Sequence, residues 1–438
     1  MSTESKIKII KTWFLICFGI FIVLFAFELS AQTANELREK IEDSNKEIQR
    51  LEAEISSFRQ QLETVGKEKN SLSKAVKELD LTNKKLAVDI KVTENKITST
   101  NLKIQSLSME IGGKEEKISQ NKSAISATLK KIEEMDSLGT LENLISRKSI
   151  FDIWRDVEDL RGFQRGVKDK ISELKEIKEG LEINKNEAEE ARQGLTRLKQ
   201  ELADQKKIVE QTTREKNQLL KETKNQEANY SKLLADRLAK QAAFEKELRE
   251  YEEQLQFILD PKKLPGRSAL SWPLDNIYIT QLFGKTVSAK RLYASGSHSG
   301  VDFRAGTGTP VKAVADGIVE GSGNTDLTCP GASFGKWVFI RHNNGLATTY
   351  AHLSLAKATS GQRVARGQVI GYSGNTGYST APHLHVTVYA SDGVKVENKP
   401  SKACGGKVYT MPIAAISAYL DPLDYLPPYT SSMVKPDL

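Results

Sequence analysis

The chain has 438 residues, of which 28% are charged and only 7% are aromatic, and its formal net charge is +7. A chain of this length should contain two or more domains, and this composition excludes one large packed globule and favours a long solvated helical region. All of the excess positive charge lies from residue 262 onward. It fits either a polyanionic surface, such as an anionic cell wall or nucleic acid, or solubility alone.

The first 31 residues have the features of an export signal. Three lysines precede the apolar run 13–27, and the small-residue sequence LSA ends at residue 31. This order is typical of a cleaved secretory signal peptide. The run is short for a membrane-spanning helix, although residues 9–27 together could form an uncleaved anchor in the inner membrane. We therefore expect an exported protein, in the periplasm, in the cell wall or on the outer face of the cytoplasmic membrane.

Two long runs of heptad-like spacing follow. Apolar residues alternate at spacings of four and three from Leu37 to Met135, and again over roughly 160–258, until Pro261 stops the second run. A pattern of this length predicts a coiled coil. We predict an antiparallel hairpin over residues 32–258, with two continuous arms on the order of 150 Å long at ~1.5 Å per residue. A kinked rod in a parallel dimer is the alternative.

The segment 137–160 between the two runs breaks the register and is predicted to be the tip of the hairpin. It contains a glycine and crowds Phe151, Ile153 and Trp154 together. Exposed at a tip, Phe151 and Trp154 would form an apolar patch that is costly unless a partner covers it. The alternative is that they pack back onto the arms.

After a linker at 259–270 the composition changes to glycine, threonine, valine and turn pairs. Short β-branched runs separated by glycine turns predict strands, and Asn344-Gly345 is a candidate hairpin turn. We predict an all-β domain with an antiparallel sheet over 271–428, followed by a tail at 429–438. Cys329 and Cys404 both fall in this domain. In an oxidising compartment they would form a disulfide, and two free thiols are the alternative.

The candidate catalytic and metal-binding residues of this domain are mainly histidines. Histidine is rare in this protein, since the whole chain has only five. In the sequence APHLHVTVY, His383 and His385 occupy alternate positions of a predicted strand, so their side chains should project from the same face. The sequence HSGVD supplies His298 and Asp302. Catalytic zinc sites use three imidazole or carboxylate ligands and leave one position for water. His298, Asp302 and one histidine of the 383/385 pair would complete such a set; unrelated polar surface residues are the alternative.

The sequence YAHLS supplies His352, whereas His342 sits apart beside the hairpin turn. Bound zinc lowers the pKa of its water towards ~7, where a nearby imidazole also titrates. The two histidines that do not bind the metal could therefore move protons.

The motifs HSGVDF, YAHLS and APHLH, together with GTPVKAVADGIV and GYSGNTGYST, resemble the LytM/lysostaphin-like zinc metalloendopeptidases over residues 271–428. The resemblance implies one zinc ion held by His298, Asp302 and His385. It also implies that His352 and His383 polarise the attacking water and stabilise the tetrahedral intermediate. The family's substrates are the peptide cross-bridges of peptidoglycan.

Two features depart from the minimal pattern of that family. Ala381 stands where a glycine is usual, which should matter only if the backbone there needs a positive φ. Cys329 and Cys404 lie in segments longer than the family core, where they could brace two loops beside the groove.

The order of parts also resembles the EnvC class of cell-division murein hydrolase activators, whose coiled coil docks on an FtsE–FtsX complex. Many of these activators lack zinc ligands, whereas every expected ligand is present here. We therefore predict an exported zinc metalloendopeptidase that cuts peptidoglycan cross-bridges and is positioned or regulated by its coiled-coil arm during wall remodelling or division. The alternative is a non-catalytic activator of cell-wall amidases that docks through Phe151 and Trp154. Nucleic-acid binding is excluded, because the basic segments lack interleaved aromatic residues and the chain is exported.

Overall fold

The computed structural model describes residues 3–66, 68, 70–137, 150–292 and 296–436, with side chains from residue 35 onward except in parts of 131–160 and 288–292. The side chains of the predicted signal or anchor segment, and those of Phe151 and Trp154, lie outside this description. Among the residues whose side chains are described, which begin at residue 35, no helix combines the length and apolar character needed to cross a membrane.

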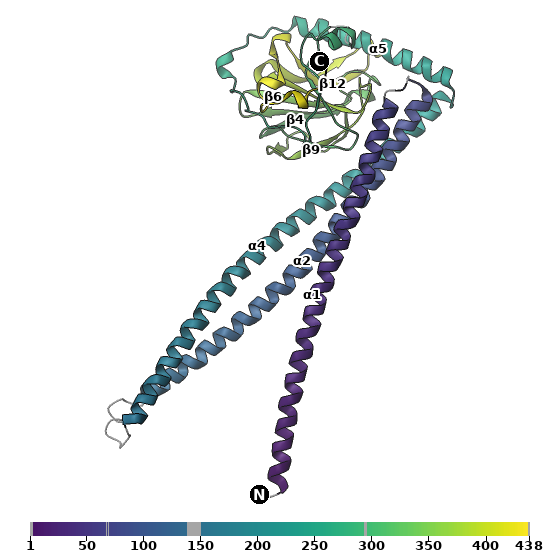
Figure 1. Ribbon diagram of the computed structural model, residues 1–438. Coiled ribbons are helices and arrows are strands. Elements are labelled where there is room, and N and C mark those ends of the chain that lie inside the picture. The colour runs from purple at the N-terminus through teal and green to yellow at the C-terminus, as the bar shows by residue number, and fades with distance from the viewer. Residues whose placement is uncertain (1–2, 67, 69, 138–149, 293–295, 437–438) are drawn as a thin grey trace. The chain divides into compact units, whose positions relative to one another are not determined.

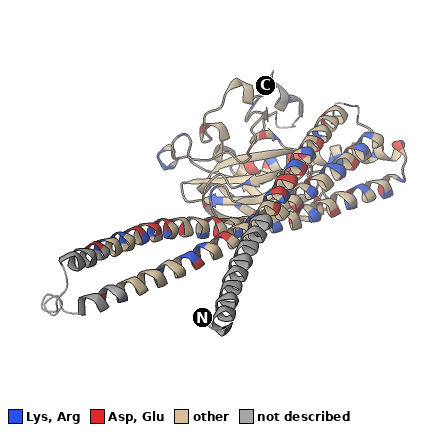
Figure 2. Ribbon diagram, turned by 60° about the horizontal axis from the view of Figure 1, so that its bottom comes forward, with Lys and Arg blue, Asp and Glu red and all other residues tan. Residues whose placement is uncertain are grey.

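The described chain divides into two compact units, which are residues 1–52 with 91–202, and residues 53–90 with 203–438. Four long helices account for most of the first 254 residues: α1 (Thr3–Gly66), α2 (Leu72–Ser137), α4 (Ile150–Thr223) and α5 (Glu227–Gln254). Lysine, arginine, aspartate and glutamate are interspersed along the described parts of these helices (Figure 2).

Within the first unit, antiparallel helices pair through apolar seams that contain a few polar contacts. Ser44 Oγ of α1 donates to the Asn95 carbonyl of α2 at 3.0 Å. Lys114 of α2 donates from Nζ to the Gly180 carbonyl at 2.8 Å and to Asn184 Oδ1 at 3.2 Å, both on α4. The prediction of long antiparallel helices within one chain is confirmed. The lysine at the seam fixes the register by satisfying one carbonyl at one position.

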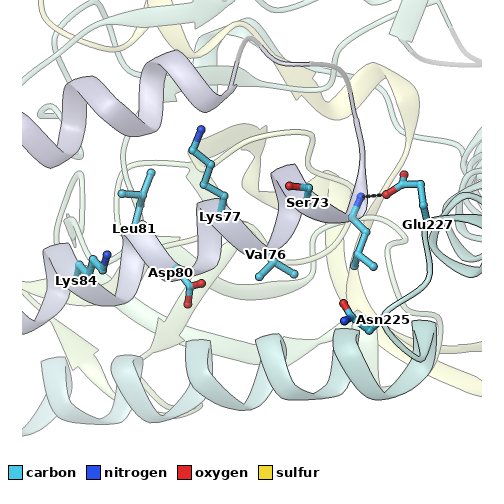
Figure 3. Close-up of a pocket in the computed structure, with 9 residues that line it drawn as sticks. Ser73, Val76, Lys77, Asp80, Leu81, Lys84, Asn225 and Glu227 are labelled. Carbon is cyan, nitrogen blue, oxygen red and sulfur yellow. Dashed lines mark hydrogen bonds between the residues drawn. The ribbon is translucent and has the colours of Figure 1, made fainter.

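The prediction of two unbroken arms is wrong. The first run reverses between Gly66 and Leu72, so α2 runs back along α1, and the second run breaks at Lys224 and Asn225, which take positive φ angles of 49° and 56°. Glu227 at the start of α5 accepts the Leu72 N–H at 2.8 Å beside an open cleft (Figure 3). The 4-3 spacing resumes after each turn, so it cannot reveal that the chain has reversed direction.

The C-terminal domain is built from short antiparallel strands, as predicted. The largest sheet has the order β1-β2-β10-β6-β5-β4-β8, with β13 also paired to β10; β3-β9-β7 and β11-β12 form smaller sheets, and the short helix α6 (Val287–Leu292) follows β1. The strands are β1 (Ile279–Gln281), β2 (Val301–Arg304), β3 (Pro310–Lys312), β4 (Gly317–Asn324), β5 (Lys336–His342), β6 (Leu346–Ala351), β7 (Leu353–Ala356), β8 (Arg363–Val364), β9 (Val369–Ser373), β10 (His383–Ala390), β11 (Val394–Pro400), β12 (Val408–Ala414) and β13 (Tyr419–Leu420). The Asn344-Gly345 turn joins β5 to β6, with Gly345 at a φ of +85°.

Strand β10 is buried on both faces. Its even-numbered residues Leu384, Val386 and Val388 belong to the main core, together with Phe303 and Tyr350. Its odd-numbered residues begin with His383 and His385 and end with Tyr389, which packs in a second apolar cluster. Alternation along one strand therefore separates the core from the functional side chains.

Helix α5 packs on the odd-numbered side of this sheet. Phe244 is 1% exposed and belongs to the second cluster with Tyr409 and Met411, and Leu248 and Tyr251 pack against the same group. The segment predicted as a linker also packs on the domain, since Leu264 contacts the main core and Leu270 lies within it. Burial of these apolar side chains holds α5 against the β domain.

The parts of α2 and α4 that belong to the second unit also contact the smaller sheet β3-β9-β7. Leu86 of α2 and Ile208 of α4 cluster with Tyr372 of β9. The Asp204 carboxylate, which is 3% exposed, accepts from the Tyr372 hydroxyl at 3.3 Å and pairs with Lys357 at 2.9 Å. The β domain is therefore packed against helical residues at two places within this unit.

Candidate metal centre

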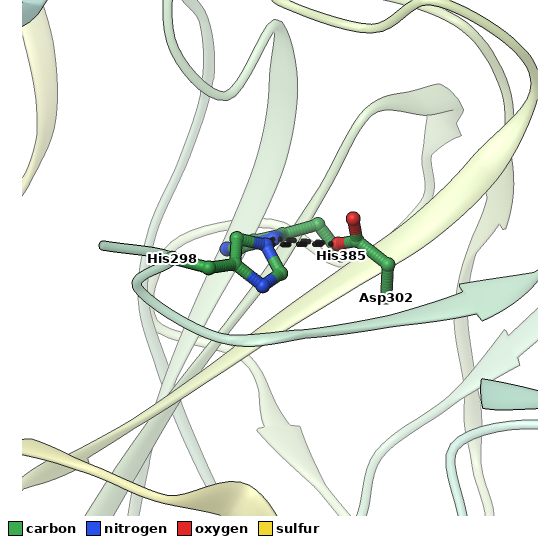
Figure 4. Close-up of side chains that lie close together, drawn as sticks. All are labelled: His298, Asp302 and His385. Atoms are coloured by element: carbon green, nitrogen blue, oxygen red, sulfur yellow. Dashed lines mark hydrogen bonds and ion pairs between the residues drawn. The ribbon is translucent and has the colours of Figure 1, made fainter. Parts of the chain in front are cut away.

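Strand pairing brings together three residues that are far apart in the sequence. Asp302 on β2 lies directly opposite His385 on β10, and His298 lies in the turn that leads into β2 (Figure 4). This turn passes so close to β10 that a Cβ at Gly300 would lie 2.3 Å from the Val386 carbonyl oxygen. The glycine of the HSGVD motif is therefore required for the close approach that places His298.

The ligand atoms of His298, Asp302 and His385 all lie within 4.8 Å of one another, and all three residues are buried. His385 Nδ1 is 2.9 Å from Asp302 Oδ1 and 3.0 Å from His298 Nε2, and His298 Nε2 is 3.2 Å from the same oxygen. Ligands about 2.05 Å from a tetrahedral zinc ion would be roughly 3.3 Å apart. Two imidazoles and one carboxylate at this spacing fit a metal ion, and together they form a metal-binding His–Asp–His triad.

The ring nitrogens that face away from the triad are held by other groups. His298 Nδ1 donates to the Leu282 carbonyl at 2.9 Å, and His385 Nε2 lies 2.8 Å from Thr387 Oγ1. Such outer hydrogen bonds fix the orientation of a ligand imidazole and leave its other nitrogen for the metal. Thr387 was not predicted, although its place two residues after His385 on the same strand face could have indicated it.

The local electrostatics keep the carboxylate charged. Burial opposes ionisation of Asp302, but the neighbouring His298 and His383 outweigh it and hold the pKa of Asp302 well below its usual value. Burial lowers the pKa of His385. Burial also disfavours the charged form of His298, whereas the adjacent Asp302 carboxylate reverses this effect and raises the pKa of His298. A divalent cation requires an ionised carboxylate and neutral imidazoles, so Asp302 and His385 favour the metal-ready state, whereas metal binding must displace the proton that Asp302 favours on His298.

His352 and His383 lie beside the triad as a second pair of imidazoles. Their ring centroids are 4.6 Å apart, and His383 Nε2 lies 3.6 Å from Asp302 Oδ1. Each Nδ1 lies 2.8 Å from a carbonyl oxygen, of Thr376 for His352 and of Ala381 for His383. Because a carbonyl can only accept, each Nδ1 carries the proton and each Nε2 is left for the site.

His352 has a strained backbone and a neutral side chain. Its φ of 58° is uncommon for a residue with a Cβ and costs of order 1–3 kcal/mol. Burial, followed by the nearby His383 and His385, lowers the pKa of His352 well below its usual value. Ala381 is not among the residues with positive φ, so the alanine in place of glycine is accommodated as expected.

His342 has a structural role. Its Nδ1 donates to the Asp316 carbonyl at 3.0 Å, and its Nε2 lies 2.8 Å from Thr348 Oγ1. Burial lowers the pKa of His342 to about 4, so the ring stays neutral inside the domain.

A cleft of about 230 Å³ lies over the triad, and α5 forms one of its walls. The β domain contributes His298, His352, His385, Ser333, Phe334 and Tyr378, and α5 contributes Phe244, Glu245, Leu248, Arg249 and Glu252. This contact could not be predicted, because the coiled-coil pattern extends through α5 and no motif marks the residues that face the cleft.

The predicted disulfide is present and joins Cys329 to Cys404. Cys329 follows β4 and Cys404 lies in the turn between β11 and β12, so the bridge ties two loops of the same domain. Both sulfurs belong to the apolar cluster that includes Phe244 of α5.

Comparison with known proteins agrees with this geometry. Residues 296–398 match Peptidase family M23. The DD-carboxypeptidase/endopeptidase Mpg of Neisseria meningitidis is 47% identical over 88 residues, which is 20% of this chain and 19% of that protein. The peptidoglycan DD-endopeptidase ShyC of Vibrio cholerae is 43% identical over 89 residues, again 20% of this chain and 19% of that protein. The chain therefore spans less than a quarter of the length of the curated relatives that it matches.

Among solved structures, the catalytic domain of lysostaphin from Staphylococcus simulans is 34% identical, with a TM-score of 0.22, over 26% of this chain and 81% of that chain. The family match contains the three triad residues and both flanking histidines. The C-terminal part of this chain is an M23 peptidase (LytM/lysostaphin-like) domain, and a long helical region precedes it.

Proposed function

We propose that this protein is an exported zinc metalloendopeptidase that hydrolyses peptide cross-bridges of peptidoglycan. The observation that carries the proposal is the convergence of His298, Asp302 and His385 within 4.8 Å inside an M23 peptidase domain. When bound, zinc supplies Lewis-acid polarisation of a water molecule and of a peptide carbonyl. Two imidazoles and one carboxylate leave a position for that water.

His352 and His383 are proposed to handle the proton and the developing negative charge. Their Nδ1 atoms are held by backbone carbonyls, so Nε2 of each ring is left for the reaction; His352 lines the cleft, and His383 Nε2 lies 3.6 Å from Asp302 Oδ1. A neutral imidazole at this position can accept a proton from water and later return it to the leaving amine. The imidazolium that forms when the ring accepts this proton can then stabilise the oxyanion of the reacting carbonyl.

The substrate class is supported by the names of the similar proteins, which include a peptidoglycan DD-endopeptidase and a DD-carboxypeptidase/endopeptidase. The Cys329–Cys404 disulfide is typical of an oxidising compartment outside the cytoplasm. Both observations favour action on the cell wall after export.

The helical region is proposed to position or regulate the enzyme. Helix α5 forms a wall of the cleft over the triad, and Phe244 and Leu248 line it, so we propose that α5 moves aside when a peptide binds. We further propose that the segment around Phe151 and Trp154 binds a membrane complex of the FtsE–FtsX type. Unchanged pull-down of such a complex by a Trp154→Ala variant would contradict this.

The enzymatic role is tested by clearing of a peptidoglycan suspension with the full chain. A chelator should abolish clearing and zinc should restore it, and Asp302→Ala should be inactive. Asp392→Ala is the matched control, because Asp392 is an exposed carboxylate of the same domain. The assay is repeated with Phe244→Ala and Leu248→Ala, which loosen α5. Equal clearing by Asp302→Ala and the wild type would overturn the proposal and favour a non-catalytic amidase activator.

A further inference from the structure

Glu247 on α5 is held by three donors from consecutive residues of the β11–β12 turn. Ser401 Oγ donates to Glu247 Oε2 at 3.0 Å, the Lys402 N–H donates to Oε1 at 3.0 Å, and the Ala403 N–H donates to Oε2 at 3.3 Å. Both carboxylate oxygens are therefore satisfied, and hydrogen bonds to an ionised acceptor are stronger than neutral ones. We refer to residues 401–403 as the carboxylate receptor.

The carboxylate receptor is fixed by bonds that do not involve Glu247. Ser401 is completely buried, its N–H donates to the Lys407 carbonyl at 3.0 Å, and its carbonyl accepts the N–H groups of Cys404 at 3.3 Å and Gly406 at 2.7 Å. The disulfide to Cys329 anchors the same turn. Backbone N–H groups fixed in such a turn form a concave anion site that exists before the anion arrives.

The carboxylate receptor binds α5 next to the residues of that helix that line the cleft over the triad. Glu247 directly precedes Leu248, which lines the cleft with His298 and His385. On the proposed function, α5 moves aside when a peptide binds in the cleft that Leu248 lines. In the working enzyme Glu247 then leaves, and a ready-made site for a carboxylate is vacant beside the bound peptide.

We propose that the 401–403 turn is a substrate subsite that binds a free carboxylate of the peptide, and that Glu247 is an internal mimic of that carboxylate. The part that concerns the substrate rests on the proposed function. Capture of a peptide carboxylate by a backbone nest is a known mode of recognition. The substrate and α5 compete for the same three donors, so a peptide that carries a carboxylate displaces α5 more readily than one that lacks it.

The first test measures binding without hydrolysis. The full-length Glu247→Ala variant leaves space for acetate, which should raise its melting temperature in a saturable manner, whereas the neutral isostere acetamide should not. Wild type and Glu250→Ala should not respond, because Glu247 still fills the carboxylate receptor; Glu250 is exposed and faces Lys246 on the same helix. Adding Ser401→Ala to Glu247→Ala should remove the acetate effect.

Folding of each variant is checked by circular dichroism and by retention of the disulfide. Glu247→Gln provides a second variant that keeps the volume of the side chain, and it should show no acetate effect because the amide still occupies the space. An equal response to acetate with and without the Ser401 hydroxyl would contradict the proposal that the 401–403 turn binds a free carboxylate. The absence of any response in Glu247→Ala would contradict it as well.

The second test concerns the substrate. In the Glu247→Ala background, Ser401→Ala should raise KM about tenfold for a peptide with a free carboxylate, the loss expected for one hydrogen bond to a charged group. The KM for the matching carboxamide peptide, and kcat for both, should change little. Equal effects on both peptides would overturn the substrate assignment. If no variant hydrolyses any peptide, the proposed function fails while the acetate titration still decides the binding site.

Discussion

The long helices and the β domain place their important residues in different ways. In the helices one apolar spacing is repeated over hundreds of residues, and a polar residue such as Lys114 fixes the register through the Gly180 carbonyl. In the β domain each position is specific, because Gly300, Asp302 and His385 must meet across two strands. A repeated pattern defines the type of element but not where the chain turns, whereas short motifs define a site but not what covers it.

Among variants that keep the metal triad, the largest effects are expected at the two histidines beside it. His352→Ala and His383→Ala should lower hydrolysis by roughly 10²–10⁴-fold, the range for loss of a general acid or base. Both variants should retain zinc, because the triad is intact. Metal content and the rate on a defined cross-linked peptide are measured together, with His342→Gln as a control for loss of a buried imidazole. Loss of zinc from His383→Ala would make His383 a ligand instead.

The disulfide should matter for the β domain and not for the helices. Replacing Cys329 and Cys404 by serine should lower the free energy of unfolding of the β domain by about 2–5 kcal/mol. Fluorescence of the β-domain residues Trp272 and Trp337 reports this transition in urea, and ellipticity at 222 nm reports the helices. Equal shifts of both unfolding transitions would mean that the disulfide stabilises the helices as much as the β domain.

A smaller effect is expected where the two kinds of structure meet, at Glu252 of α5. Burial raises the pKa of Glu252 to about 7, against the hydrogen bond from Tyr419 at 2.5 Å and the charge of Arg249. The carboxyl returns to its ordinary pKa when α5 leaves, so the neutral form favours the packed helix. Packing should therefore be strongest below about pH 4.5 and weaken as the pH rises through 7, by at most about 3 kcal/mol.

Limited proteolysis of α5 at pH 5 and pH 8 measures this change. Cleavage should be faster at pH 8 in the wild type and nearly independent of pH in Glu252→Gln. Glu253→Gln, whose carboxylate is exposed and pairs with Arg249, serves as the control. A pH dependence that survives in Glu252→Gln would assign it to another group.

The smallest effect is expected at the turn before α5. Lys224 takes a φ of 49°, which favours glycine, so Lys224→Gly should stabilise the helices by up to about 1 kcal/mol. Thermal melting followed at 222 nm measures the change, and Lys221→Gly inside α4 should destabilise by a similar amount. A loss of stability in Lys224→Gly would mean that its side chain makes contacts that outweigh the strain.

Much of the candidate site could be predicted from the sequence, because its chemistry is concentrated in motifs. Alternation predicted that His383 and His385 share a face, and the shortage of histidines drew attention to His298 and His352. The disulfide was predicted from two cysteines in one domain that was expected to be exported. These inferences needed only local geometry and the chemistry of a few rare side chains.

What escaped prediction depends on contacts between distant segments. The reversal at Gly66 left the apolar spacing intact, and α5 follows the same spacing although it packs on a sheet instead of a partner helix. Glu247 looks like any other glutamate on a charged helix until the 401–403 turn is placed against it. No periodicity encodes such pairings, because each depends on the folded path of the whole unit.

The division of β10 between two faces has a consequence for how the domain can change. Deleting or inserting a single residue within β10, between His385 and Val388, would move the side chains on one side of the change to the opposite faces, placing hydrocarbon next to the metal or imidazoles in the interior. Fold and chemistry would be lost together. We therefore expect changes in length to be tolerated in the loops around β10 and not within the strand itself.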